Sequence, residues 1–222
     1  MKETLATLSK NSLFEGIDEV DIKRILDCLS ARVRSYKKNA FVFRTNDKVE
    51  LIYILLSGSA HIIEDDFWGN QLIVETLRAP VLFGEAYVLS GAKKHLVSVA
   101  AAEDSNILLI NPSRLFEKCP NACACHATLI KNISGILSQK VVRLTQKLLH
   151  VAQRTTRQKL ISYFSTCSAV QKESAFQIPY SRQQLADFLC VERSALSHEL
   201  SRMQSDGLIR YRKNHFELLK TE

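Results

Sequence analysis

The chain has 222 residues, of which 46% are hydrophobic and 24% charged, as expected for a globular protein of one or two domains. No run of about 18 apolar residues predicts a membrane span, and the first residues lack the apolar stretch of a signal peptide. We therefore expect a cytoplasmic protein. Residues 126–222 carry 15 Lys and Arg against 7 Asp and Glu, whereas residues 1–125 carry 15 against 16. This basic C-terminal part favours a polyanionic partner such as nucleic acid, although a merely basic surface would look the same.

The N-terminal part predicts one helix followed by a compact all-β unit. Residues 17–29 place apolar side chains at helical spacing behind Asp18, which is a suitable N-cap. Between residues 31 and 110, short apolar runs alternate with turn-forming pairs such as Ser57-Gly58 and Ser90-Gly91. Many short strands with regular punctuation indicate a jelly-roll-like β-roll.

Residues 126–151 then predict one long helix. The segment contains no proline, and its apolar residues follow steps of three and four: Ile130, Ile133, Leu137, Val141, Leu144, Leu148 and Val151. A stripe that is longer than its own domain usually packs on a partner helix, so we expect a homodimer. The alternative is a long helix packed within its own domain.

The C-terminal part predicts a second small unit. Residues 155–167 have the pattern of a helix, residues 168–174 that of a polar loop, and residues 209–219 that of two short strands around Lys213-Asn214. Between them, Ser181 and Gln184 have the spacing of a capping box at the start of a helix over 182–189. A turn over 190–192 and a helix over 193–205 follow, which ends before Gly207.

The helix over 193–205 has two different faces. Leu196, Leu200 and Met203 form a buried face, whereas Ser194, Ser197, His198 and Ser201 lie opposite, with Arg193 at the leading edge. Small donors beside a long cationic side chain suit a helix that enters the DNA major groove. A serine-rich solvent face would give the same pattern, but the preceding helix, the tight turn and the following hairpin favour DNA binding.

The segment SRQQLADFLCVERSALSHELSRMQSDGLI resembles the helix-turn-helix of the Crp/Fnr regulators. The upstream order is similar too: VRSYKKNAFVF, LIYILLSGSAHI, FGE and then a long helix. The resemblance covers nearly the whole chain. It implies a β-roll sensor, a dimerisation helix, a winged helix-turn-helix, a palindromic promoter site and contact with RNA polymerase. The fold class is accordingly α+β, with a sensor over 1–125, a dimerisation helix over 126–151 and a DNA-binding domain over 152–222.

The resemblance also implies roles for individual residues in DNA binding. The base-reading positions fall on Arg193, Ser194, Ser197 and His198, where histidine at 198 replaces the usual arginine. The positions that contact the DNA backbone fall on Ser181, Arg182 and Gln183, and Lys213 in the wing turn is a further phosphate contact.

The sensor departs from the members of the family that bind cyclic nucleotides. Their phosphate cassette begins with Gly-Glu and continues about ten residues later with Arg-Ser. Gly84 and Glu85 match its beginning, but His95 and Leu96 occupy the Arg-Ser positions. Neutral histidine lacks the permanent charge that neutralises a phosphate, which disfavours cyclic AMP. We expect an unidentified small-molecule effector near Val74, Phe83, Gly84, Glu85, Tyr87, His95 and Leu96.

A cysteine cluster offers a different signal. Cys119, Cys123, Cys125 and His126 are closely spaced and supply ligands suited to zinc, haem or an iron–sulfur cluster. A redox-sensing regulator is therefore the alternative function, although small buried residues on the helix stripe would show the same spacing. The N-terminal cysteine array of the oxygen-sensing members of the family is absent.

Two other classes of protein fit less well. No phosphate loop, nucleophile elbow or metalloprotease motif occurs, so we do not expect an enzyme. A regulatory binding module without DNA function would not need the winged helix-turn-helix. Whether the regulator activates or represses depends on the position of its promoter site.

Overall fold

The computed structural model describes residues 6–66, 68, 71–116 and 124–219, which divide into two compact units over 1–138 and 139–222. The division falls inside the long helix α5 (Ala124–Val151), which begins two residues before the predicted 126. The predicted division into three segments stays a prediction. No helix among the described residues is long and apolar enough to cross a membrane.

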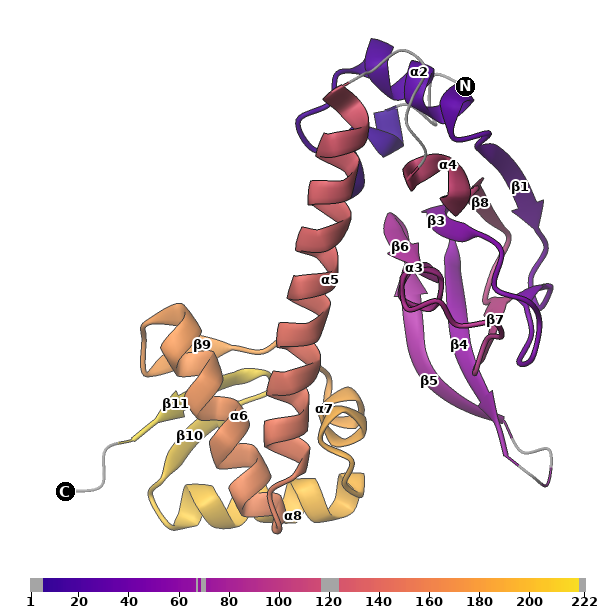
Figure 1. The fold of residues 1–222 in the computed structure, drawn as a ribbon. Coiled ribbons are helices and arrows are strands. Elements are labelled where there is room, and N and C mark those ends of the chain that lie inside the picture. Colours follow the sequence, from indigo (N-terminus) through magenta and orange to yellow (C-terminus); the bar gives the residue numbers. More distant parts are fainter. Residues whose placement is uncertain (1–5, 67, 69–70, 117–123, 220–222) are drawn as a thin grey trace. The chain divides into compact units, whose positions relative to one another are not determined.

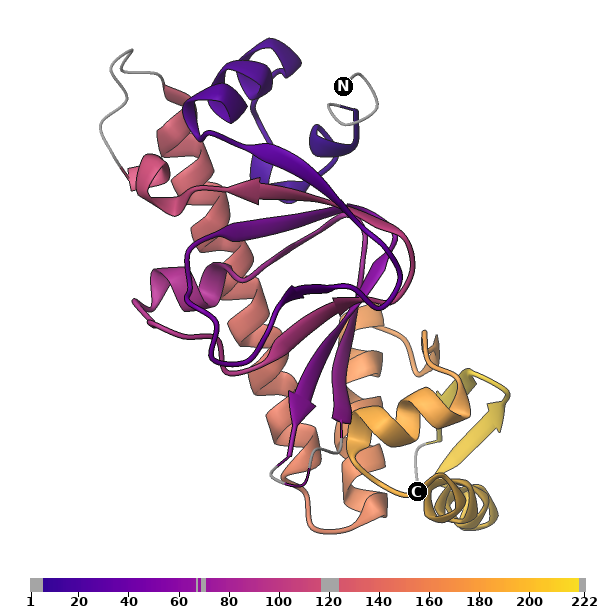
Figure 2. The ribbon, with the colours of Figure 1, turned by 90° about the vertical axis from the view of Figure 1, so that its right-hand side faces the viewer.

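Unit 1 is a roll of two four-stranded sheets that face each other (Figures 1 and 2). One sheet has the order β1-β8-β3-β6, and the other has the order β2-β7-β4-β5. Each predicted apolar run became a strand, with these bounds: β1 Arg32–Tyr36, β2 Phe41–Phe43, β3 Ile52–Ser57, β4 Ser59–Asp65, β5 Gln71–Arg78, β6 Val81–Phe83, β7 Ser98–Ala101 and β8 Ser105–Ile110. The expected β-roll is thereby confirmed.

Strand β3 shows how the roll carries two cores. Its side chains alternate between the two faces of the sheet, so Tyr53 and Leu55 point into the roll while Ile52 and Ile54 point outward. The outer face is covered by α2 (Glu19–Cys28) and by the N-terminal part of α5. Asp18 caps α2 by accepting a hydrogen bond from the Asp21 backbone, as the sequence predicts.

The same unit contains short helical elements that the sequence did not predict, among them η1 (Ser12–Phe14), α3 (Glu85–Leu89) and α4 (Pro112–Phe116). Their apolar stretches are too short to display a helical period. The turn between β3 and β4 requires Gly58, which has a φ of +85°. A Cβ there would clash with the Ser105 side chain and lie 2.8 Å from the Asp104 carbonyl oxygen.

Unit 2 combines the C-terminal part of α5 with three further helices and a small sheet. Helices α7 (Arg182–Leu189) and α8 (Arg193–Ser205) have the predicted bounds, as has the turn between them. The strands β10 (Ile209–Arg212) and β11 (His215–Leu218) form the predicted hairpin. Strand β9 (Ala175–Gln177) pairs with β11 and was not predicted.

The prediction for the end of the first helix of unit 2 was wrong. Helix α6 (Thr156–Gln171) continues four residues beyond 167 into the segment expected to be a loop. Residues 168–171 include no glycine or proline to stop the helix. The helix ends where Lys172 takes a left-handed conformation, with a φ of 57°.

Candidate DNA-binding face and sensor interior

The helix-turn-helix begins with a complete capping box. Ser181 Oγ accepts a hydrogen bond from the Gln184 backbone at 3.3 Å, and Gln184 Oε1 accepts one from the Ser181 backbone at 2.9 Å. This pair fixes the start of α7, as its spacing predicts. Cys190 then ends α7 in a left-handed conformation, with a φ of 52°, and directs the chain into α8.

Helix α8 separates its buried and exposed residues as the sequence predicts. Leu196, Leu200 and Met203 are at most 1% exposed and pack in the core of unit 2. On the other side, Arg193, Ser194 and His198 are exposed and Ser197 is half-buried. Ser194, Ser197 and His198 therefore lie on one accessible face, with Arg193 exposed at its leading edge.

Arg157 on α6 holds α8 from behind, a role that sequence reasoning missed. Its guanidinium lies 2.5 Å from Glu199 Oε1 and 2.7 Å from Asp206 Oδ2. The two carboxylates raise the pKa of Arg157 by hydrogen bonding and charge. The guanidinium thereby neutralises Glu199 on α8 and Asp206 at the C-terminal end of that helix. The Glu199 side chain is only 14% exposed.

The residues predicted to contact the DNA backbone differ in their contacts within the protein. Arg182 lies over the rings of Tyr211 and Phe216, donates a hydrogen bond to the Lys213 carbonyl oxygen at 3.3 Å, and has its pKa lowered by burial. It thus fastens the wing to α7. The Gln183 side chain is bonded to Asp187 at 2.8 Å. Lys213 is exposed at the tip of the wing.

The start of the predicted phosphate cassette in unit 1 is tightly constrained. Gly84 precedes α3 with a φ of +77°. A Cβ there would lie 2.8 Å from the Tyr53 ring, so the backbone passes closer to this ring than a residue with a side chain would allow. Glu85 follows at the helix N-terminus and is 2% exposed.

His95 fills the interior beside this cassette. Its ring is fully buried, stacks on Phe43 with a centroid distance of 3.8 Å, and meets Tyr87 edge-on at 5.1 Å. Neither ring nitrogen has a hydrogen-bond partner among the residues that the structure describes. Phe83 joins the same aromatic group through Phe43, at 6.4 Å.

The remaining predicted effector residues do not join this buried group. Leu96 is 74% exposed, and Val74 on β5 is 51% exposed. Lys93 and Lys94 are exposed as well. The interior beside Gly84 and Glu85 therefore presents aromatic rings and a neutral imidazole where an arginine would neutralise a phosphate, so these residues do not fit a cyclic nucleotide.

Acid should destabilise unit 1 through His95. Burial lowers the pKa of His95 below 6.5, and the nearby Asp47 carboxylate opposes this only in part. The folded state therefore binds fewer protons than the unfolded state, so the free energy of unfolding falls as the pH drops from 6.5 through the lowered pKa. Thermal unfolding above and below pH 6.5 measures the loss.

The matched variant for this prediction is His95→Phe, which keeps a ring on Phe43 but cannot titrate. It should lose less stability in acid than the unchanged protein. Burial also lowers the pKa of His150 in unit 2, but that contribution is common to both proteins. An identical dependence on pH in both would contradict the role of His95.

The structure describes only half of the predicted metal cluster. Cys119 and Cys123 lie outside the described residues, whereas Cys125 and His126 begin α5. Within the described part of the chain, no three His, Cys, Asp or Glu side chains are grouped to hold a metal ion. Cys28 Sγ lies 3.7 Å from His126 Nε2, a contact that sequence reasoning missed because 98 residues separate the pair.

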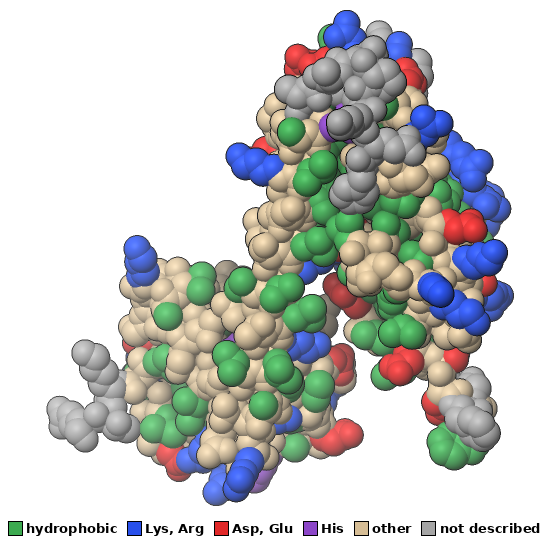
Figure 3. All heavy atoms as spheres, viewed as in Figure 1, with side chains coloured by type: hydrophobic (Ala, Val, Ile, Leu, Met, Phe, Trp, Pro, Cys, Tyr) green, Lys and Arg blue, Asp and Glu red, His purple; other side chains and the backbone are tan. Residues whose placement is uncertain are grey.

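The apolar stripe of α5 divides into two parts. Ile133 is 4% exposed in the core of unit 1, and Leu137 packs at its edge. Farther along, Val141, Leu144 and Leu148 are 61–66% exposed. Figure 3 shows hydrophobic side chains gathered over this C-terminal part of α5. That part is therefore available to meet a partner helix.

Comparisons with known proteins agree with this architecture. The cyclic nucleotide-binding domain family model matches residues 33–121, and the Crp-like helix-turn-helix domain model matches residues 142–222. The anaerobic regulatory protein of Bacillus subtilis (strain 168) is 22% identical, with 85% of this chain and 79% of the relative covered. The CRP-like protein Clp of Xanthomonas oryzae pv. oryzae (strain PXO99A) is 23% identical, with 89% and 87% covered.

A solved structure of the c-di-GMP responsive global regulator CLP of Xanthomonas campestris has the same fold. Its TM-score is 0.58 at 22% identity, and 92% of this chain and 100% of that chain are covered. In this chain the matched cyclic nucleotide-binding domain precedes the matched helix-turn-helix domain, and α5 spans the boundary between them. The chain therefore belongs to the Crp/Fnr family of transcription regulators, which join a cyclic nucleotide-binding domain to a Crp-like helix-turn-helix.

Proposed function

We propose that this regulator binds a palindromic promoter site as a dimer, and that each α8 reads one half-site through Arg193, Ser194, Ser197 and His198. The observation that carries the proposal is the accessible face of α8, where no acidic side chain stands between these four residues. Arg157 adds to it by pairing with the carboxylates of Glu199 and Asp206. Lys213 at the wing tip contacts a phosphate.

The test of this proposal is Arg193→Ala. A side chain that binds a base edge contributes about 1–3 kcal/mol, so the affinity for a DNA site selected from a random library should fall by about 5- to 150-fold. Gel-shift titration at one fixed salt concentration measures it. The variant should fold normally because Arg193 is exposed.

Arg24→Ala is the matched control for Arg193→Ala. It removes the same charge from α2 in unit 1, where the side chain is 77% exposed. Its affinity for the selected site should stay unchanged. Equal affinities of the Arg193 variant and the unchanged protein would refute base reading by Arg193.

Regulators of this family bind promoter DNA as dimers, and the exposed part of α5 supplies the surface for that contact here. Val141, Leu144 and Leu148 lie one helical turn apart and are mostly exposed. In a parallel helix pair the two α8 helices enter successive major grooves, about 34–36 Å apart. RNA polymerase is the further partner that the family resemblance implies.

A small molecule other than cyclic AMP controls the dimer by binding in the roll near Phe83, Glu85, Tyr87 and His95. The Xanthomonas campestris relative is named as responsive to c-di-GMP. A cyclic dinucleotide also carries phosphates. The positions of His95 and Leu96 supply no arginine to neutralise them. An effector that suits this interior is largely apolar. It carries a small number of hydrogen-bonding groups, which bond to the ring nitrogens of His95.

Calorimetric titration tests the cyclic AMP part of this proposal. We expect no heat of binding from cyclic AMP, because no fixed positive charge compensates the buried phosphate. The same preparation must bind the selected DNA, which shows that it is competent. Tight binding of cyclic AMP would overturn this view of the sensor while leaving the DNA-reading face intact.

A further inference from the structure

The strongest feature outside the DNA-binding face is the attachment of α5 to the rest of unit 2. Among the described residues, those that form the apolar core of unit 2 include none from α5. Over residues 139–151, all of which are described, His150 in the last turn of α5 is the one buried residue, at 4% exposed. The attachment of the long helix thus centres on a polar side chain.

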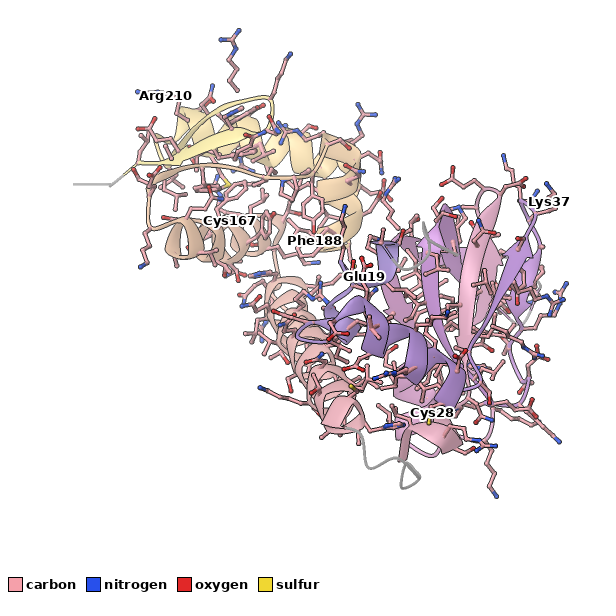
Figure 4. The ribbon with its side chains drawn as sticks, turned by 90° about the horizontal axis from the view of Figure 1, so that it is seen from above. Glu19, Cys28, Lys37, Cys167, Phe188 and Arg210 are labelled. Atoms are coloured by element: carbon pink, nitrogen blue, oxygen red, sulfur yellow. The ribbon has the colours of Figure 1, made fainter. Side chains whose placement is uncertain are left out.

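His150 contacts the next two helices of the chain. Its Nδ1 atom forms a hydrogen bond of 2.8 Å with Ser162 Oγ on α6. Its ring meets the Tyr163 ring edge-on, with the centroids 5.6 Å apart. The ring of Phe188 on α7, which Figure 4 labels, lies 6.4 Å away. Lys147, one turn earlier on α5, places its ammonium 5.5 Å from the centre of the same Phe188 ring.

The hydrogen bond of His150 spans the turn that separates α5 from α6. Residues 152–155 form this turn, and Thr155 then caps α6 in a capping box with Gln158. A few residues between two helices can absorb a change of backbone angles and so act as a hinge. His150 and Ser162 lie on opposite sides of the turn, 12 residues apart, so their bond closes it.

Helix α6 is in turn fastened to both helices of the helix-turn-helix. Lys159 Nζ donates hydrogen bonds to the carbonyl oxygens of Leu189 and Cys190, at 3.0 and 3.3 Å, where α7 ends. Arg157 pairs with Glu199 on α8. Polar contacts therefore connect the end of α5, through α6, to the helix that carries the base-reading face.

A buried hydrogen bond fixes an angle between helices more sharply than apolar packing does. Apolar side chains repack at modest cost, whereas separating His150 from Ser162 leaves a buried ring nitrogen without its partner. Burial also lowers the pKa of His150, so the ring is neutral at neutral pH and carries no charge that would draw it out to solvent. The pair therefore favours one arrangement of α5 and α6.

We propose that His150 and Ser162 are positioning residues for DNA reading: their hydrogen bond fixes the angle between α5 and α6 and thereby sets the spacing of the two α8 helices on the palindrome. Neither side chain touches DNA in this role. The inference rests on the proposed binding of a palindrome by the dimer, because spacing matters only when two half-sites, about 34–36 Å apart, are read together.

The test compares full-length variants on a palindromic site selected from a random library and on a duplex that carries one half-site. Ser162→Ala removes the hydrogen bond and leaves α8 unchanged, so its affinity for the half-site, measured by fluorescence anisotropy, should stay the same. Its affinity for the palindrome should fall by about 10-fold or more, because the gain of about 10²- to 10⁴-fold from linking two sites depends on their geometry. Ser165→Ala, at an exposed position of the same helix, is the matched control and should bind both duplexes as before.

A panel of palindromes with lengthened or shortened spacers gives a readout that a merely stabilising contact would not change. The unchanged protein should bind one spacing much more tightly than its neighbours. Ser162→Ala should bind the neighbouring spacings with more nearly equal affinity. Ser162→Thr, which keeps the hydroxyl, should restore the preference for one spacing.

A double-mutant cycle assigns the effect to the pair itself. His150→Phe keeps a ring beside Tyr163 and Phe188 but cannot form the hydrogen bond. It should lose as much affinity for the palindrome as Ser162→Ala does. The double variant should lose no more than either single variant, because both substitutions remove the same interaction.

Two results would overturn the positioning role in a protein that prefers the palindrome to the half-site. One is a Ser162→Ala variant that keeps the palindrome affinity and the spacing preference of the unchanged protein. The other is an equal loss on both duplexes, which would make the pair a stabilising contact only. An unchanged protein that binds the half-site as tightly as the palindrome would instead refute the proposed dimer binding, and the positioning role with it.

Discussion

Replacing both Leu144 and Leu148 by aspartate should convert the protein to a monomer and remove its tight binding to palindromic DNA. Both side chains are more than 60% exposed in the single chain. Burying a leucine at an interface stabilises it by about 1.5–3 kcal/mol. The two aspartates forfeit that contribution on each chain and also place carboxylates in the helix pair, where burying an unpaired charge is costly.

The effect on DNA binding should be larger than that of any single base contact. Two half-sites bound by linked domains gain about 10²- to 10⁴-fold in affinity over one alone. A monomer loses this gain while its α8 face stays unchanged. Sedimentation and gel shift on the same samples measure the two losses together.

Val170→Asp is the matched control for the double aspartate variant. Val170 lies on α6, is 72% exposed, and is outside the α5 stripe. This variant should remain a dimer and bind DNA normally. A double aspartate variant that stays dimeric would place the dimer contact elsewhere on the molecule.

Replacing Phe164 by alanine should cost unit 2 about 3–5 kcal/mol of its free energy of unfolding. The ring is fully buried and lies 4.5 Å from the ring of Phe216 and 5.8 Å from that of Phe176. It thus joins α6 to two strands of the wing sheet. Since whole domains are stable by only about 5–15 kcal/mol, much of the stability of unit 2 should disappear.

Hydrogen exchange resolved by peptide shows where this stability is lost. Exchange should quicken over residues 156–218 and stay unchanged over the strands of the roll, residues 32–110. Phe164→Leu, which leaves a smaller cavity, should give an intermediate result. Uniformly faster exchange in both units would mean that they do not unfold independently.

The elements that the sequence predicted most closely are those marked by signals from neighbouring residues. Each of the eight apolar runs between 31 and 110 became a strand, because alternation and turn residues are properties of neighbouring positions. The bounds of α7 and α8 also agree, since the Ser181 capping box and the turn before Arg193 act within a few residues.

Features that depend on distant contacts were not predicted. Strand β9 forms because β11 pairs with it, and Arg157 acquires its role from Glu199, 42 residues later. The α5 stripe shows the same limit. Periodicity identifies the apolar face of a helix, but it does not reveal that Ile133 is covered by its own unit while Leu144 is left exposed.

The candidate sites follow the same division. Helical spacing alone placed Ser194, Ser197 and His198 on one face of α8, with Arg193 at its leading edge. In the sensor, the register of the cassette identified His95 as the residue in place of arginine, but its stacking on Phe43 required the folded roll. The contact between Cys28 and His126 had no signal in the sequence.

The two faces of α8 make this helix a natural target for redesign. Packing and an ion pair hold α8 in place through Leu196, Glu199, Leu200 and Met203. These residues are separate from the four predicted to read DNA bases. Exchanging the base-reading residues for those of another regulator would leave these packing and ion-pair contacts intact. Promoter preference could thus be rewritten, by mutation in nature or by grafting in the laboratory, without repacking the protein beneath it.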